Sequence, residues 1–169
     1  DDPMATEKIW DKLYWILCPR GQTGIGCHAI AAIDVALWDI KGKALGEPVW
    51  RLLGAARESV PVYCTFGFFE FDREQLAEAA KHWVAEGFSG LKMVVGHNGL
   101  KRRDEPRPLA DVIAEDLRRI QGVREAVGPD ITLYVDANCG LDQHHALDLA
   151  RRMEEFDIGF FEEPITQND

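Results

Sequence analysis

The feature that most constrains the fold is a regular alternation of strand-like and helix-like segments along residues 56–169. Four short apolar runs, at 60–65, 90–95, 131–135 and 159–161, predict β-strands. Amphipathic stretches at 72–87, 109–127 and 143–156 predict the helices between them. Short connections between such elements favour parallel strands joined by right-handed crossovers. The alternation therefore predicts an α/β architecture built on a parallel sheet.

The first part of the chain does not share this rhythm. Apolar residues at helical spacing predict one helix over 5–17 and a second from about 28 to 44. Gly46 followed by Pro48 is a usual helix ending, and a short helical turn is expected at 49–53. We therefore predict two domains, a helical one at 1–55 and a β/α one at 56–169.

Four strands are too few to close a barrel. A complete (β/α)₈ barrel needs about 250 residues, and a four-stranded sheet leaves its last strand unpaired at one edge. We expect the rest of the barrel elsewhere, or a truncated or partial chain; the opening Asp1-Asp2-Pro3 is typical of the middle of a longer protein. A doubly wound nucleotide-binding fold is the alternative, but no glycine-rich phosphate loop follows the first strand.

Polar side chains lie where three of the predicted strands end. Lys92 is on the second strand, Asp136 and Asn138 end the third, and Glu162 ends the fourth. In parallel α/β folds, ligands bind at this carboxyl edge of the sheet. Two carboxylates on neighbouring strands supply the hard oxygen ligands that a divalent cation such as Mg²⁺ prefers. Two ordinary acidic strand ends are the plainer interpretation.

Bulk properties exclude several functional classes. The formal net charge is −10, and no basic face is available for nucleic acid. No apolar run is long enough to span a membrane, and no signal peptide is visible. The four cysteines form no CxxC pair or zinc spacing and sit among apolar or small residues, as reduced buried cysteines do. This pattern favours a cytoplasmic protein.

The polar strand ends also indicate a reaction. A cation held by Asp136 and Glu162 would grip a substrate carboxylate, and Lys92 would add a second positive charge beside it. Such an arrangement stabilises a carboxylate as it becomes an enediolate. Abstraction of an α-proton beside a carboxylate requires this stabilisation.

With these residues in place, the sequence as a whole resembles the enolase superfamily and, within it, the mandelate racemase/muconate lactonizing enzyme group. Four stretches, in the family's order, carry the likeness: residues 32–46, 87–92, 135–138 and 161–164. The resemblance implies the first half of a (β/α)7β TIM-like barrel at 56–169. It also implies that residues 1–55 are the helical part of an α+β capping domain.

The resemblance assigns roles residue by residue. It implies Asp136 and Glu162 as the first two Mg²⁺ ligands, with a third acid beyond Asp169, and Asn138 beside the substrate or the metal. Lys92 matches the first lysine of the family's Lys-x-Lys motif, which contacts the substrate carboxylate, and we take it as a catalytic residue. The second lysine is replaced by Val94.

Val94 limits the range of reactions that we expect. A two-base racemase or epimerase that relies on this lysine is disfavoured, whereas a one-base reaction with a His–Asp dyad from later strands stays open. We expect a Mg²⁺-dependent, homo-oligomeric lyase that dehydrates a sugar acid. The alternatives are a cycloisomerase, a racemase or epimerase, a non-catalytic truncated fragment, or an interaction protein built on half a barrel. His97 and Asn98 are further candidates for substrate contact.

Overall fold

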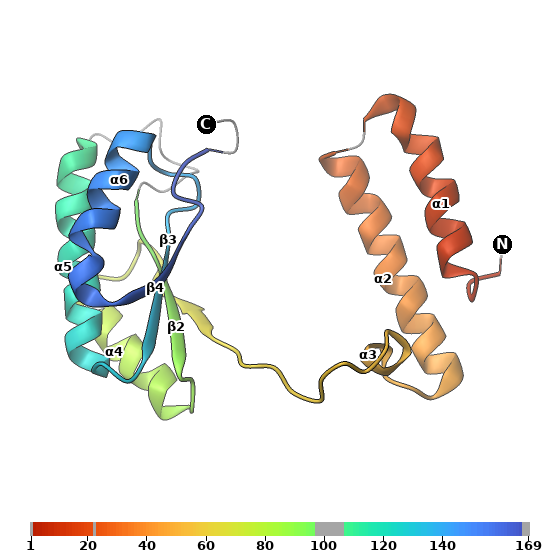
Figure 1. The fold of residues 1–169 in the computed structure, drawn as a ribbon, viewed down its shortest axis with the longest axis horizontal. Coiled ribbons are helices and arrows are strands. Elements are labelled where there is room, and N and C mark those ends of the chain that lie inside the picture. Colours follow the sequence, from red (N-terminus) through yellow and green to blue (C-terminus); the bar gives the residue numbers. More distant parts are fainter. Residues whose placement is uncertain (1, 22, 97–106, 167–169) are drawn as a thin grey trace. The chain divides into compact units, whose positions relative to one another are not determined.

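The computed structural model describes residues 2–21, 23–96 and 107–166, and the chain divides into two compact units, Asp1–Val60 and Pro61–Asp169 (Figure 1). Each unit is described by itself. Among the helices of the described segments, none is long and apolar enough to cross a membrane.

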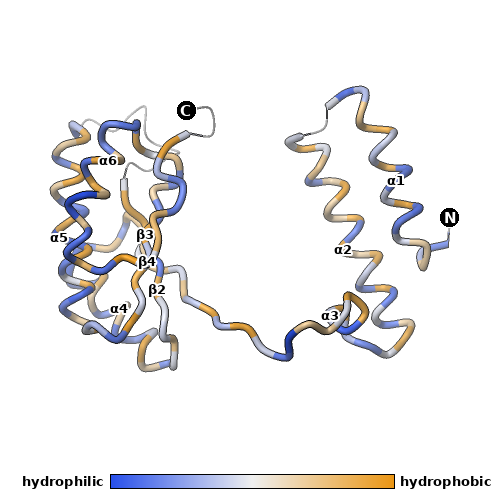
Figure 2. Tube along the Cα trace, in the orientation of Figure 1, coloured by the Kyte–Doolittle hydropathy of each residue, from blue (hydrophilic) through white to orange (hydrophobic). Residues whose placement is uncertain are grey.

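The first unit is helical. It contains α1 (Thr6–Leu17), the short 3₁₀ turn η1 (Cys18–Arg20), α2 (Ile25–Leu45) and α3 (Val49–Leu52), and α1 lies antiparallel beside α2 (Figure 1). The second helix begins three residues before the predicted start and ends at Gly46, whose left-handed φ of 68° terminates it as predicted. Hydrophobic residues recur along both long helices (Figure 2), and several stay exposed, including Trp15 and Val35.

The second unit is a parallel sheet with helices between its strands. Its strands are β1 (Cys64–Phe66), β2 (Gly90–Val94), β3 (Thr132–Asp136) and β4 (Ile158–Glu162), hydrogen-bonded in the order β1-β2-β3-β4. The connecting helices are α4 (Arg73–Ala85), α5 (Leu109–Val127) and α6 (Gln143–Arg152), followed by the 3₁₀ turn η3 (Glu154–Phe156). This confirms the predicted α/β class, and the sequential order lacks the reversal that marks a doubly wound sheet.

The hydrophobic core lies between the sheet and the helices, which are grouped on one side of it (Figure 1). Alternate strand residues point to opposite faces of a sheet. Leu91 and Met93 of β2, with Leu133 and Val135 of β3, are fully buried against the helices. The intervening residues, among them Lys92, therefore point to the other face. This periodicity places the polar strand residues away from the core.

Two sequence expectations need correction. The first strand pairs only over 64–66, because Val60 to Tyr63 have no partners on β2, and Pro61 has no N–H to donate. The cysteines are not buried: Cys27 is exposed, and Cys18, Cys64 and Cys139 are partly exposed. All four are free of disulfide bonds, as expected.

Candidate functional site

Three of the predicted site residues meet at the carboxyl edge of the sheet. The Lys92 ammonium donates a hydrogen bond to Asp136 Oδ2 at 3.1 Å and a second one to Glu162 Oε2. The side chains of Lys92 and Asp136 are each 9% exposed, whereas that of Glu162 is 37% exposed. A buried ion pair is thus open to solvent on its Glu162 side.

A bulge in β4 brings Glu162 into this cluster. Leu133 pairs with Ile158, but Val135 pairs with Phe161, so β4 has one more residue than β3 between these pairs. The extra residue shifts the register, and Glu162 therefore lies opposite Asp136. Without it, Glu162 would lie opposite Ala137, one residue further along β3. The bulge therefore brings the Glu162 carboxylate beside Asp136.

The other oxygen of Asp136 is held by Asn138. The Asn138 backbone N–H and side-chain Nδ2 both donate to Asp136 Oδ1, at 2.9 and 2.8 Å. Asn138 and Cys139 both have left-handed φ values, 45° and 57°. The Cys139 N–H donates to the carbonyl of Glu163, which fixes this turn against the end of β4. Both oxygens of the Asp136 carboxylate are therefore oriented.

Lys92 remains a cation in this setting. Burial by itself lowers its pKa, but the hydrogen bonds and charges of Glu162 and Asp136 outweigh burial and raise the pKa above its ordinary value. The Tyr63 ring adds a face 5.7 Å from the ammonium. At neutral pH, Lys92 is consequently suited to binding an anion rather than to accepting a proton.

Comparison with known proteins decides the family. Residues 2–54 match the model for the mandelate racemase/muconate lactonizing enzyme N-terminal domain, and residues 75–169 match the model for the enolase C-terminal domain-like family. The chain belongs to the enolase superfamily. This confirms the resemblance drawn from the sequence.

Relatives within the enolase superfamily catalyse more than one reaction. An arabinonate dehydratase from Saccharolobus solfataricus is 35% identical over 98% of this chain, and a D-galactarolactone cycloisomerase from Agrobacterium fabrum is 40% identical over 97% of it. The chain spans 41% of the length of each. The crystal structure of an L-talarate dehydratase from Polaromonas sp. JS666, complexed with Mg and L-glucarate, aligns over all of this chain and 44% of that one. Its TM-score is 0.83 at 36% identity.

The side chains of this cluster have the donor chemistry that a Mg²⁺ ion requires. The carboxylates of Asp136 and Glu162 already share one cationic centre, the Lys92 ammonium, so their oxygens converge on a point where positive charge is stable. Carboxylate oxygens are also the donors that Mg²⁺ selects. Within residues 2–21, 23–96 and 107–166, no three His, Cys, Asp or Glu side chains converge as a metal site would require. Within the described part of the chain, a bound cation would therefore have two carboxylates at this cluster, Asp136 and Glu162.

Two other side chains with metal-binding chemistry, Glu163 and His145, have different partners. The carboxylate of Glu163 faces Cys139, whose Sγ is 3.8 Å from Oε2. His145 contacts Asp142 at the start of α6, where Asp142 caps the helix. His97 and Asn98 lie outside the described residues.

Sequence reasoning missed an aromatic layer on the same face of the sheet. Tyr134 stacks on Phe160 with ring centroids 4.2 Å apart, and Tyr63 meets both rings edge-on. Lys92 lies directly opposite Tyr134 in the strand register. The signal was one aromatic residue beside or within each of three strands: Tyr63 immediately precedes β1, and Tyr134 and Phe160 are the central residues of β3 and β4.

Proposed function

We propose that this chain contributes half of the active site of a Mg²⁺-dependent enzyme that abstracts the α-proton of a carboxylate substrate. The observation that carries the proposal is the convergence of Asp136 and Glu162 on one cationic position, at the ends of neighbouring strands in an enolase-superfamily chain. We also infer that residues 1–55 are the helical part of a capping domain and 56–169 the first half of its barrel. The whole protein is proposed to be a homo-oligomer.

Each residue has a distinct task in this proposal. Asp136 and Glu162 would hold Mg²⁺, and bound Mg²⁺ would stabilise negative charge on the substrate carboxylate as an enediolate forms. Asn138 keeps one Asp136 oxygen in place, and we propose that it also contacts substrate. Lys92 binds the substrate carboxylate through the ammonium that it keeps charged.

Val94 argues for a reaction that needs only one base. It is two residues after Lys92, it is 3% exposed, and it cannot accept a proton. A base on the opposite side of the substrate, outside residues 1–169, would remove the α-proton. Dehydration of a sugar acid fits this pattern best, because elimination of a β-hydroxyl can follow removal of the α-proton by one base. A cycloisomerase or racemase is the second candidate, and a non-catalytic fragment is the third.

The test uses the protein at its full natural length, whether or not it extends past Asp169, with Mg²⁺ and a panel of sugar acids. Dehydration releases a 2-keto-3-deoxy acid, which carbonyl reagents detect. Cycloisomerisation of a lactone loses no water, and racemisation or epimerisation gives a stereoisomer of the substrate, which a change in optical rotation detects. The proposal predicts a new carbonyl product and at least about a 100-fold loss of kcat/KM in Asp136→Asn. Normal turnover by that variant would refute the assignment.

A further inference from the structure

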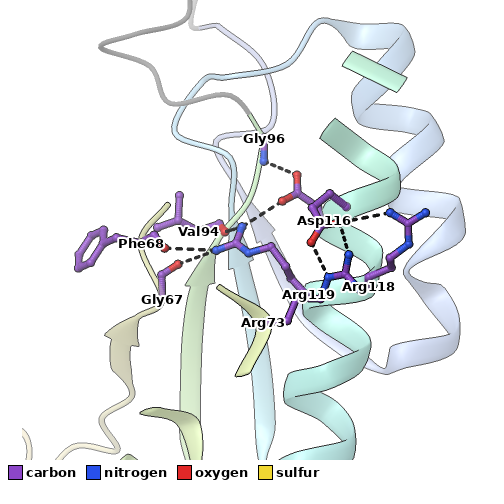
Figure 3. A network of polar contacts seen from close by, with 9 residues as sticks. Gly67, Phe68, Arg73, Val94, Gly96, Asp116, Arg118 and Arg119 are labelled. Atoms are coloured by element: carbon purple, nitrogen blue, oxygen red, sulfur yellow. Dashed lines mark hydrogen bonds and ion pairs between the residues drawn. The ribbon is translucent and has the colours of Figure 1, made fainter. Parts of the chain in front are cut away.

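A buried ion pair on α5 holds the strand ends next to the candidate site (Figure 3). Asp116 and Arg119 are 3% and 7% exposed and are joined at 3.1 Å. Arg119 also donates to the carbonyls of Val94, Gly67 and Phe68, at 3.1, 3.2 and 3.3 Å. These four contacts come from one guanidinium group.

Asp116 holds the same region through its other oxygen. The backbone N–H of Gly96 donates to Asp116 Oδ2 at 2.7 Å (Figure 3). Val94 and Gly96 follow Lys92 by two and four residues on the same strand and its extension. The pair therefore grips the segment that carries Lys92 through one carbonyl and one amide group.

The contacts begin where the β1–β2 pairing stops. The last registered pair of these two strands is Phe66 with Met93. Beyond this pair, the carbonyls of Gly67 and Val94 both accept hydrogen bonds from the Arg119 guanidinium rather than from backbone N–H groups of the neighbouring strand. Only a planar, forked donor can bond several carbonyls at once in a fixed geometry. Arg119 thus continues the connection between β1 and β2 past the end of their ladder.

We propose that Asp116 and Arg119 are positioning residues for Lys92. By fixing the exits of β1 and β2, they hold the β2 backbone that places the Lys92 ammonium beside Asp136 and Glu162. The idea rests on the proposed function, in which Lys92 binds the substrate carboxylate. The hydrogen bonds of Asp116 and Arg119 go to each other and to backbone groups rather than to Lys92, so their effect passes through the backbone of β2.

The same helix provides a matched control. Arg124 donates to the carbonyls of Gly128, Ile131, Phe156 and Asp157, at 2.7–3.1 Å. Ile131 and Asp157 immediately precede β3 and β4, so these contacts lie at the opposite end of the strands from the site. Both arginines clamp backbone carbonyls to α5, but only Arg119 does so beside Lys92.

The experiment compares Arg119→Lys with Arg124→Lys in the full-length protein, each alone and combined with Lys92→Met. Lysine keeps the charge but loses the fork. At a temperature where every variant is folded by circular dichroism, Arg119→Lys should lower kcat/KM on the best sugar acid by roughly 10- to 100-fold. Arg124→Lys should lower it by less than about 3-fold. In a protein that already carries Lys92→Met, adding Arg119→Lys should lower kcat/KM by less than about 2-fold, because Arg119 acts through Lys92.

Hydrogen exchange measures positioning without activity. Arg119→Lys should speed backbone amide exchange at residues 92–96. Arg124→Lys should instead speed it at residues 128–132. Should Arg119→Lys not fold, Asp116→Asn is the milder variant for the same comparison. Equal losses of activity from both arginine variants, or an undiminished Arg119→Lys effect without Lys92, would overturn the proposal. No turnover by the parent protein on any acid, with the exchange pattern as expected, would count against the proposed function alone.

Discussion

Asp116 gives the sharpest quantitative prediction, because it is an acid buried beside the site. Burial raises the pKa of Asp116 to about 6, although the Gly96 N–H and the positive charges of Arg119 and Arg107 act to lower it. In the unfolded chain its pKa returns to about 3.9. Between these values the folded protein binds a proton that the unfolded chain has released, so stability falls as the pH rises.

The magnitude follows from the two pKa values. A difference of about 2.1 pKa units corresponds to about 2.9 kcal/mol over the whole titration. About 1.4 kcal/mol of this lies between pH 5 and pH 8, since part of the change is already complete at pH 5. An asparagine at this position keeps an oxygen for Gly96 but does not titrate. Other groups titrate alike in both proteins and cancel from the comparison.

The assay is urea unfolding of the parent protein and Asp116→Asn at pH 5 and pH 8. The difference in unfolding free energy between the two proteins should shift by about 1.4 kcal/mol in favour of the variant at pH 8. The pH-dependent shift of the Gly96 amide resonance reports the same titration directly. A stability difference that does not change with pH, or one that changes in the opposite sense, would show that Gly96 and Arg119 dominate over burial.

Three further substitutions test the packing of the sheet, the start of α4 and the charge beside the carboxylates. In Gly159→Ala the new methyl would lie 2.6 Å from Tyr134 Cε1, so the free energy of unfolding in urea should fall by about 1–3 kcal/mol. The control is Gly122→Ala, whose methyl meets nothing within 4 Å and which should leave stability unchanged or raise it. Asp72→Ala removes a capping box from α4 and should cost about 1 kcal/mol in the same assay. Lys92→Met should tighten Mg²⁺ binding in calorimetry by roughly tenfold, because one positive charge leaves the carboxylates. A weaker or unchanged Mg²⁺ affinity would contradict the shared cation position.

Sequence periodicity predicted most of the fold and the centre of the site. The apolar stripes predict each long helix of the described residues, and the rule that ligands bind at the carboxyl ends of parallel strands predicts that Lys92, Asp136 and Glu162 lie together. That rule depends only on strand direction. It therefore holds even where the exact strand bounds were wrong, as they were for β1.

The bulge in β4 could not be predicted. Gly159-Phe160-Phe161 offers two adjacent phenylalanines, and periodicity alone does not say which one packs in the core. The structure pairs Phe161 with Val135 on the core side and stacks Phe160 on Tyr134 on the other. Register at such a point is set by contacts with the neighbouring strand rather than by local pattern.

The Asp116–Arg119 pair was missed for a different reason. An arginine on an amphipathic helix usually lies at the surface, as Arg118 does. The available signal was that Asp116 and Arg119 interrupt the apolar stripe of Val112, Ile120 and Val123 at a spacing of three residues. Two opposite charges on the buried face of one helix indicate a paired, structural role.

The proposed function depends on joint binding of Mg²⁺ by Asp136 and Glu162. Titration calorimetry of Mg²⁺ into the full-length protein tests it most directly, with Asp136→Asn, Glu162→Gln and the neighbouring Glu163→Gln as variants. We expect one site in the parent protein, at least about a 100-fold weaker affinity in each of the first two variants, and parent-like affinity in Glu163→Gln. Parent-like binding by Asp136→Asn and Glu162→Gln, or equal weakening in all three variants, would contradict it.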